Sequence, residues 1–505
     1  MRKLRAGAGL CVSLLIGIVP KALAAQQPQS EQSQQPSQSQ QPQDQPSQPS
    51  QPIQAYHSPL AILGGTGSET NPDGLTPDTN SLAGVLDFSL GFPNERRSFW
   101  QPYLTVNATV DSDPLGLTNH SGWAGYSTVL GGIELRKFSG ISDLTLSYIG
   151  GGSFSNAGSV GDFVTQQAGL AERISMHRLN LSFFDQFDYI PEAGFGYQGL
   201  SGSLLPEGGA IGLQNSFLFG QSILTARGQR ALNTSLGQAD VLISPRSTLT
   251  VAGGYSFLQF FDNDLLNSSD IIFQAGYTRQ FGPENALGAI YRFNGYRYGS
   301  LGQSINDNTV YLSYGRRLTG RLALRLAAGP EFAYFQLPIN GATPTSGTPT
   351  SGPSATMNQA LVTYSLSTSL AYSLARTTLG LGFDRGVSDG SGVLAGAITD
   401  TVRATVAHQL ARTFAGKLSF GYSHNNGLAV ITPSTPASGA QSYDYWFGSV
   451  SLTHPFGRTA DCFVSYQTQY QTSNSTFCIG PTCETSVTRQ IISMGFSWRA
   501  HPEAF

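Results

Sequence analysis

The chain has little charge, no long hydrophobic run and no cluster of basic residues. Charged residues make up 12% of its 505 residues, about half of the ~25% that is usual in soluble domains. No stretch of about 20 apolar residues is present, so the sequence offers no transmembrane helix. The net charge is −3 and no basic stripe is present, which argues against binding of nucleic acid. A chain with these deficits needs an explanation other than a soluble domain or a helical membrane protein.

What the chain does have is a regular alternation of apolar and polar residues over residues 98–498. Runs of roughly 10–14 residues are joined in turn by very short turns and by longer loops rich in Gly, Ser, Asn and Asp. In one run, Leu287 and Tyr291 share a face, and Arg292 and Asn294 share the other. The polar faces carry mainly Ser, Thr, Gln and Gly, whereas the outer face of a soluble sheet normally carries Lys and Glu. The pattern predicts an all-β fold, a transmembrane antiparallel up-and-down β-barrel of the bacterial outer membrane, with a wet lumen.

We count eighteen strands in this pattern, and 16 or 20 remain alternatives because the runs near residues 169, 182 and 238 are the least regular. The runs are centred near residues 104, 129, 146, 169, 182, 238, 254, 275, 291, 312, 328, 366, 381, 404, 418, 448, 465 and 492. An even count places both termini on the periplasmic side and the long loops outside.

The first 97 residues are expected to lie outside the barrel. Residues 1–24 have the basic start, short apolar run and small-residue cleavage site of a signal peptide, and its removal with four basic residues takes the net charge from −3 to −7. Residues 25–54 are almost wholly Gln, Pro and Ser, which predicts a disordered periplasmic spacer. Residues 55–97 are interpreted as a periplasmic lead-in or plug segment, which leaves residues 98–505 for the barrel.

The cysteines and histidines suggest no metal chemistry. Cys478 and Cys483 lie close together in a loop and predict a disulfide, which suits an oxidising compartment; two free thiols are the alternative. Cys462 falls within an alternating run and is interpreted as a small apolar side chain. The seven histidines show no metal-ligand spacing. We therefore expect no metal, no cofactor and no enzymatic activity.

The last alternating run resembles the assembly signal of bacterial outer-membrane proteins, an apolar alternating strand that closes on an aromatic residue. The residues that carry the resemblance are Ile492, Met494, Phe496 and Trp498, with Phe505 at the end of the chain. The tail after Trp498 leaves open which aromatic residue is the recognised end. The resemblance implies that the barrel-assembly machinery inserts the chain among outer-membrane lipids.

A second resemblance, which rests on loop order alone, is to the porins. In porins the third external loop folds into the barrel and narrows it, and residues 189–230 form the third and longest external loop of this chain. A constriction is one interpretation of this loop, and an outward surface loop or cap is the other. Porin constrictions carry carboxylates opposite arginines, and Glu192 and Glu207 are the candidates that this loop offers.

The polar faces also supply candidate cations for the lumen. They are Arg292, Arg321, Arg325, Arg403, Lys417 and Arg489. Rings of Arg or Lys favour anions in a pore, although such residues can instead bond to neighbouring backbone or carboxylates and set no selectivity. Most aromatic residues are expected to face lipid, with Phe260, Tyr311 and Phe463 as candidates for the inner face.

We predict an outer-membrane channel for passive or weakly selective diffusion of small polar or anionic solutes, because barrels of about 16–18 strands leave an aqueous channel. One alternative is an export conduit for a polysaccharide, with the spacer joining a periplasmic partner. The other is a non-transporting structural or adhesive barrel that the third external loop plugs.

Overall fold

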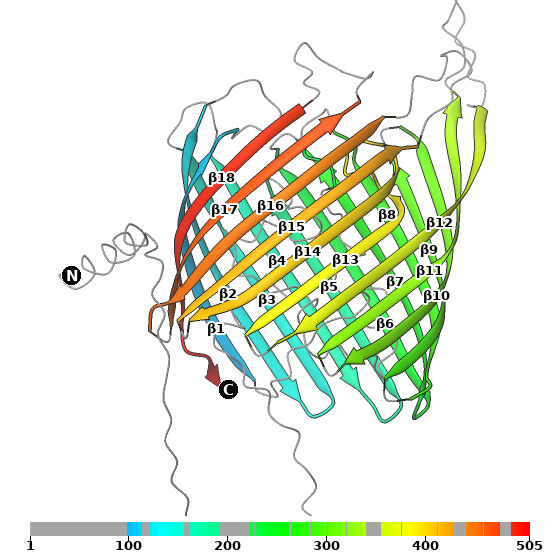
Figure 1. The fold of residues 1–505 in the computed structure, drawn as a ribbon, viewed down its shortest axis with the longest axis horizontal. Coiled ribbons are helices and arrows are strands. Elements are labelled where there is room, and N and C mark those ends of the chain that lie inside the picture. Colours follow the sequence, from blue (N-terminus) through cyan, green and yellow to red (C-terminus); the bar gives the residue numbers. More distant parts are fainter. Residues whose placement is uncertain are drawn as a thin grey trace, which may run out of the picture. The chain divides into compact units, whose positions relative to one another are not determined.

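Eighteen long strands succeed one another in the part of the chain that the structure, a computed structural model, describes (Figure 1). They are β1 (Phe99–Asp111), β2 (Ala124–Ser139), β3 (Ser142–Ser155), β4 (Phe163–Ser175), β5 (Leu179–Ile190), β6 (Arg230–Ser244), β7 (Ser247–Phe260), β8 (Ser268–Gln280), β9 (Asn285–Tyr298), β10 (Gln303–Thr319), β11 (Leu322–Ile339), β12 (Ala355–Ser373), β13 (Thr377–Ser388), β14 (Ala397–Ala411), β15 (Phe414–Gly427), β16 (Ser442–Pro455), β17 (Ala460–Ser473) and β18 (Ser486–Arg499). A two-residue strand, β19 (Glu503–Ala504), follows them.

The described residues are 98–113, 122–155, 162–191, 222–225, 228–261, 265–282, 284–299, 301–319, 321–339, 355–374, 376–411, 413–428, 441–457, 459–474 and 486–504. Several of the sequence predictions concern residues outside these ranges. They are the predictions for residues 1–24, 25–54 and 55–97, for Glu192 and Glu207, for the Cys478–Cys483 disulfide and for Phe505.

The sheet closes on itself through the pairing of its first and last long strands. Each strand from β1 to β18 runs antiparallel to the next, and β18 pairs antiparallel with β1, with Thr105 opposite Ser497 and Asp111 opposite Ile491. Strand β19 adds to the start of β1, where Ala504 lies opposite Phe99. Closure satisfies the backbone groups of every long strand against a neighbour, as a spanning sheet requires. The predicted eighteen-stranded barrel is confirmed.

The two ends of the barrel differ in the length of their connections. At one end, which we call the short-turn end, the connections are tight, as at residues 245–246 between β6 and β7. At the other, the long-loop end, the connections include residues 191–229 between β5 and β6 and residues 389–396 between β13 and β14. Strand β1 begins and strand β18 finishes at the short-turn end. The predicted rhythm of short turns and long loops is therefore present in the fold.

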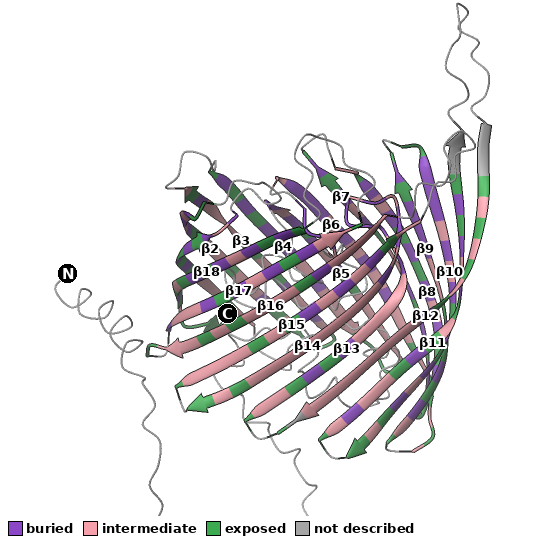
Figure 2. Ribbon diagram, turned by 45° about the horizontal axis from the view of Figure 1, so that its top comes forward, coloured by how far each residue is buried: buried purple, intermediate pink, exposed green. Residues whose placement is uncertain are grey.

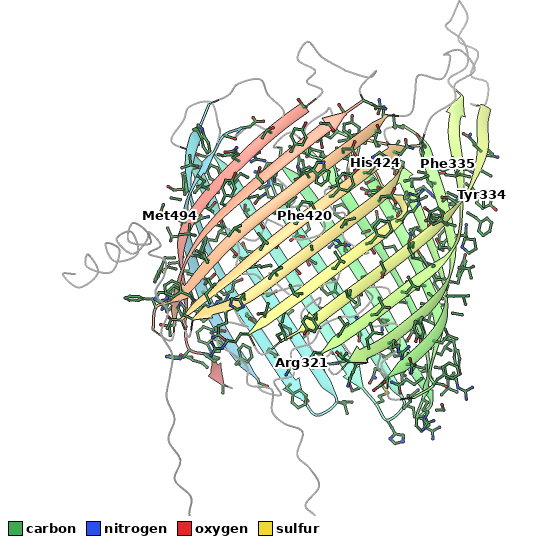
Figure 3. All side chains as sticks on the ribbon, viewed as in Figure 1. Arg321, Tyr334, Phe335, Phe420, His424 and Met494 are labelled. Carbon is green, nitrogen blue, oxygen red and sulfur yellow. The ribbon has the colours of Figure 1, made fainter. Side chains whose placement is uncertain are left out.

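Successive residues of each strand face opposite sides of the wall, because side chains alternate with a period of two. The burial colours alternate along the strands in Figure 2. In β11, Tyr334 is 50% exposed, whereas its neighbour Phe335 is 6% exposed and lies on the inner face (Figure 3). The outer face carries exposed Leu, Val, Phe, Tyr and Trp side chains, and the inner face carries mainly Thr, Ser, Gln, Asp and Arg. A closed barrel with an apolar exterior and a polar lumen is a membrane-spanning barrel.

The residues of the assembly signal lie on that apolar exterior. Ile492, Met494, Phe496 and Trp498 follow one another on the outer face of β18, all of them exposed. Cys462 lies on the outer-face side of β17 and is half-buried. Among the described residues, no helix is long and apolar enough to cross a membrane.

Candidate functional site

The candidate site is the lumen near the long-loop end, where two segments fold inward. We call residues 222–225, at the end of the long connection from β5 to β6, the strap. We call residues 389–396, the connection from β13 to β14, the inner loop. Ile223, Leu224 and Thr225 of the strap are all at most 1% exposed, although they belong to a loop. Burial of this degree means that the strap is packed against the wall of the barrel.

The strap contacts the wall opposite to its own strands. The Leu224 N–H donates to Oε1 of Gln471 at 2.6 Å, and the Leu224 carbonyl accepts from Nε2 of the same side chain at 3.2 Å. Leu224 also packs on Tyr445 and Val487, which lie on β16 and β18. Strands β6 and β15 are nine apart in a closed sheet of eighteen, so a segment next to β6 that contacts β16, β17 and β18 must cross the lumen.

A second set of bonds joins the strap to β15 and to the inner loop. The Ser222 hydroxyl donates to Oδ1 of Asn425 at 2.8 Å, and Nδ2 of Asn425 donates to the Ser222 carbonyl at 2.8 Å. The Ser222 N–H donates to Oγ of Ser391 at 3.1 Å. Ile223 packs against Leu394 and Ala397. The strap and the inner loop therefore meet and form one inward-folded unit.

Glycines allow the inner loop to lie close to the opposite wall. Gly392 has φ +76° and Gly396 has φ +86°, a left-handed region that favours glycine. A Cβ at Gly392 would collide with the ring of Phe260, and one at Gly396 would collide with Ile305. The Gly392 carbonyl accepts from the Leu266 N–H at 2.7 Å. The inner loop thus reaches β7, β10 and the connection between β7 and β8, because these positions carry no side chain.

Asp389, at the start of the inner loop, is a buried carboxyl group. Its backbone carbonyl accepts a hydrogen bond from the Tyr298 hydroxyl at 2.9 Å. Burial raises the pKa of the Asp389 side chain to about 7. Hydrogen bonds from backbone N–H groups lower this pKa, but by less than burial raises it. Burial in the seated loop therefore favours the neutral form of this group.

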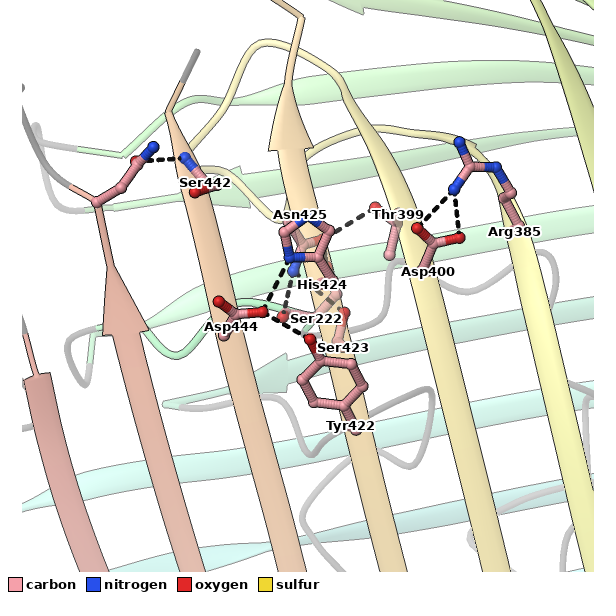
Figure 4. Close-up of polar contacts among 11 residues, drawn as sticks. Ser222, Arg385, Thr399, Asp400, Tyr422, Ser423, His424, Asn425, Ser442 and Asp444 are labelled. Atoms are coloured by element: carbon pink, nitrogen blue, oxygen red, sulfur yellow. Dashed lines mark hydrogen bonds and ion pairs between the residues drawn. The ribbon is translucent and has the colours of Figure 1, made fainter. Parts of the chain in front are cut away.

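Figure 4 shows the inner and outer faces of the wall at this level. On the inner face, the Thr399 hydroxyl and the Ser222 hydroxyl both donate to Asn425. On the outer face, Arg385 donates to both oxygens of Asp400 at 2.6 and 2.7 Å, and His424 is bonded to Asp444 at 2.8 Å. Asp400, His424 and Asp444 are direct cross-strand neighbours. The outer face thus carries a polar row across four strands near their long-loop ends.

The predicted lumen cations fall into different environments. Arg489 is fully buried and makes a two-point ion pair with Asp111, at 2.5 Å between Nη2 and Oδ2 and 3.0 Å between Nε and Oδ1. Arg403 pairs with Asp384 at 2.5 Å. Arg321 is exposed in the turn at the short-turn end (Figure 3). Arg325 and Lys417 lie at half-buried lumen positions of β11 and β15.

Arg292 lies on the inner face of β9 within a group of polar side chains. Its guanidinium lies 5.1 Å from the centre of the Tyr311 ring. Thr309 is its cross-strand neighbour on β10, and Glu331 is the next residue in the same row on β11. Within the described residues, Nε of Arg292 and Oε2 of Glu331 have no hydrogen-bond partner. Arg292 is therefore held by its charged and aromatic surroundings rather than by a closed ion pair.

Three of the lumen features lay beyond the sequence prediction. They are the partner carboxylates Asp111 and Asp384, the strap with its anchor Gln471, and the inner loop. The carboxylates occupy lumen positions of their strands, but their pairing depends on the register between neighbouring strands, which the sequence does not give. Phe260 and Tyr311 are buried on the inner face, and Phe463 is half-buried at an inner-face position of β17. Within the described residues, no group of His, Cys, Asp or Glu side chains is arranged to hold a metal ion.

No protein-family model and no curated protein matches the chain. Among solved structures, the chain is similar to OpdK of Pseudomonas aeruginosa solved with vanillate, at 10% identity and a TM-score of 0.39 over 79% of this chain and 98% of that chain. It is similar to OccAB3 of Acinetobacter baumannii at 9% identity and a TM-score of 0.41, over 80% of this chain and 99% of that one. OccK2 (OpdF) of Pseudomonas aeruginosa, solved with glucuronate, matches at 11% identity and a TM-score of 0.39, over 80% and 98%. These scores are too low to carry an argument, so the fold rests on the strand pairings themselves.

Proposed function

We propose that the chain is a channel of the bacterial outer membrane that lets small polar solutes diffuse through its lumen with weak selectivity. The short-turn end, where β1 begins and β18 finishes, faces the periplasm, and the strap and the inner loop narrow the passage near the cell surface. A closed barrel of this strand number is wide enough to hold an aqueous channel. The observation that carries the proposal is the polar inner face, on which hydroxyl, amide and paired charged groups replace the apolar residues of the exterior.

The charge distribution in the lumen supports weak rather than strong selectivity. Two of the candidate cations, Arg403 and Arg489, are each bound to a carboxylate of a neighbouring strand. A third lumen arginine, Arg136, makes a two-point pair with Asp143 at 2.7 and 2.9 Å. An arginine whose charge is neutralised at short range adds little to the field that a passing anion meets. An anion preference would then depend mainly on Arg292, which no ion pair with a described residue closes off.

The experiment is single-channel recording of the refolded protein in a planar bilayer, after heat-modifiable gel mobility has established that it is folded. We expect discrete conductance steps. A variant with Gln471→Ala and Asn425→Ala removes the anchors of the strap and should raise the conductance or its fluctuations. Thr468→Ala, on the outer face of the same strand β17, is the matched control and should leave the conductance unchanged. A well-folded barrel without steps, both in the wild type and in the anchor variant, would show that the barrel is plugged or structural.

A further inference from the structure

One side of the lumen wall carries amide groups that have no hydrogen-bond partner among the described residues. Asn107 on β1 and Gln467 and Gln469 on β17 occupy inner-face positions and are at most 4% exposed. Both amide atoms of Asn107, Nε2 of Gln467 and Oε1 of Gln469 make no hydrogen bond with any residue that the structure describes. Most buried polar groups in native proteins are hydrogen-bonded, and a buried amide without a partner is costly. These groups therefore call for a partner that the described residues do not supply.

The charges on this part of the wall neutralise each other. Arg489 lies directly opposite Gln469, and Asp111 lies across Ile491 from Gln467. The two-point ion pair of Arg489 and Asp111 leaves both side chains without exposure. The next inner-face row toward the short-turn end carries hydroxyl groups. Thr109 and Ser493 are bonded to each other there at 2.9 Å, and Ser465 lies opposite Ser493. A solute that touches this wall meets neutral donors and acceptors rather than an ionic group.

Gln471, the glutamine of β17 nearest the long-loop end, shows what Gln467 and Gln469 can bind. Gln467, Gln469 and Gln471 occupy successive inner-face positions of β17, which places them about 6.6 Å apart along the strand. Gln471 holds the backbone amide of Leu224 by donating to its carbonyl and accepting from its N–H. A side chain at this wall therefore acts as donor and acceptor at once toward a group in the lumen. Gln467 and Gln469 present the same chemistry.

Phe463 lies on the inner face of the same strand β17, nearer the short-turn end than the glutamines. The ring of Phe463 and the side chain of Asn107 meet over Gly495 of β18, where a Cβ would lie 2.6 Å from Cζ of Phe463 and 2.7 Å from Cβ of Asn107. Because position 495 carries no side chain, the tip of the Phe463 ring and the Asn107 side chain approach each other over it. An apolar ring face beside an amide suits a ligand that has C–H groups on one side and hydroxyl groups at its edge.

We propose that Phe463, Asn107, Gln467 and Gln469 form a binding track for uncharged, polyhydroxylated solutes such as sugars. Vicinal hydroxyl groups donate to the amide oxygen and accept from the amide nitrogen, and the ring of Phe463 takes the apolar face of the solute. A carboxylate gains less, because the arginine of this wall is already bound to Asp111. The inference rests on the proposed channel function and names its substrate class.

The test uses the channel recordings, with maltose as the neutral probe and citrate as the anionic probe. Maltose should block the open wild-type channel at concentrations well below those at which citrate does. In the variant Asn107→Ala/Gln467→Ala/Gln469→Ala, block by maltose should weaken about tenfold or more, because several hydrogen bonds are lost. Gln490→Ala, on the outer face of β18, is the control and should retain block by maltose.

The outcomes separate the two proposals. A conducting wild-type channel that maltose does not block, or that citrate blocks equally well, overturns the track and leaves the channel standing. Undiminished block by maltose in a triple variant that still folds and conducts also overturns it. If the triple variant does not fold, the comparison of the two probes on the wild-type protein still decides. A folded barrel without any conductance overturns both the channel and the track.

Discussion

The ion pair between Asp111 and Arg489 should be a main stabilising contact of the seam that closes the barrel. Asp111 is the last residue of β1, and Arg489 lies on β18, so the pair joins the first and last long strands. Both side chains have 0% exposure, and three contacts of 2.5 to 3.1 Å join them. Removing one partner of such a buried pair typically costs about 3–5 kcal/mol, because the other charge remains buried without its partner.

We therefore expect Asp111→Asn to lower the free energy of unfolding by about 3–5 kcal/mol. The hydroxyl pair Thr109–Ser493 in the same seam provides a comparison. Ser493→Ala should lower the free energy of unfolding by only about 1 kcal/mol. The measurement is a reversible denaturant titration of the refolded protein in lipid vesicles, with the slope compared between variants to confirm that the same surface unfolds.

A double variant tests the physical reason. Asp111→Asn combined with Arg489→Gln removes both charges, so it should be more stable than Asp111→Asn alone, because no unpaired charge remains. The reasoning is refuted if Asp111→Asn costs no more than Ser493→Ala, or if the double variant loses the sum of the two single losses. Either result would mean that water or another group solvates Arg489 when Asp111 is absent.

The other predictions concern the lumen. Arg292→Gln should shift the reversal potential in a salt gradient toward cations, since it removes a charge that no closed ion pair neutralises; an unchanged reversal potential would assign the selectivity elsewhere. Seating of the inner loop should weaken as pH rises from about 4 to 7, by at most about 4 kcal/mol, because the released Asp389 ionises while the seated one, next to Tyr298 and Asp270, stays neutral. Conductance fluctuations should then increase between about pH 4 and 7, and Asp389→Asn should abolish this dependence. Gly392→Ala should displace the inner loop from Phe260 and raise conductance at every pH, which the same recordings measure.

The strands were predictable because their signal is local. A strand that faces lipid on one side and water on the other must alternate, so the pattern around Tyr291 or Phe420 is readable within a few residues. Even the runs near residues 169, 182 and 238, the least regular ones, correspond to β4, β5 and β6. The count of eighteen then follows from the rhythm of short turns and long loops.

The lumen contacts were not predictable, because each depends on residues brought together by closure of the sheet. Gln471 and Leu224 are 247 positions apart, and Arg489 and Asp111 are 378 apart. The sequence showed Arg403 and Arg489 as cations on polar faces, but only the register shows that Asp384 and Asp111 lie beside them. The strap has no pattern of its own, since a short segment buried against a wall needs only to fit that wall.

The two sides of the lumen differ in chemistry, and this difference bears on what can pass. On the side of β9 to β11, Arg292, Asp307 and Glu331 each keep a polar atom without a hydrogen-bond partner among the described residues, so the unsatisfied groups there belong to ionisable side chains. On the side of β1, β17 and β18, the ionic groups are consumed by the Asp111–Arg489 pair and the available groups are amides. One wall of the lumen is therefore charged and the other is neutral.

An uncharged solute can bind the amides without the desolvation of an ion, whereas an anion must compete with Asp307 and Glu331 for Arg292. Passage of neutral solutes should for this reason respond to substitutions on β17, and passage of ions to substitutions on β9.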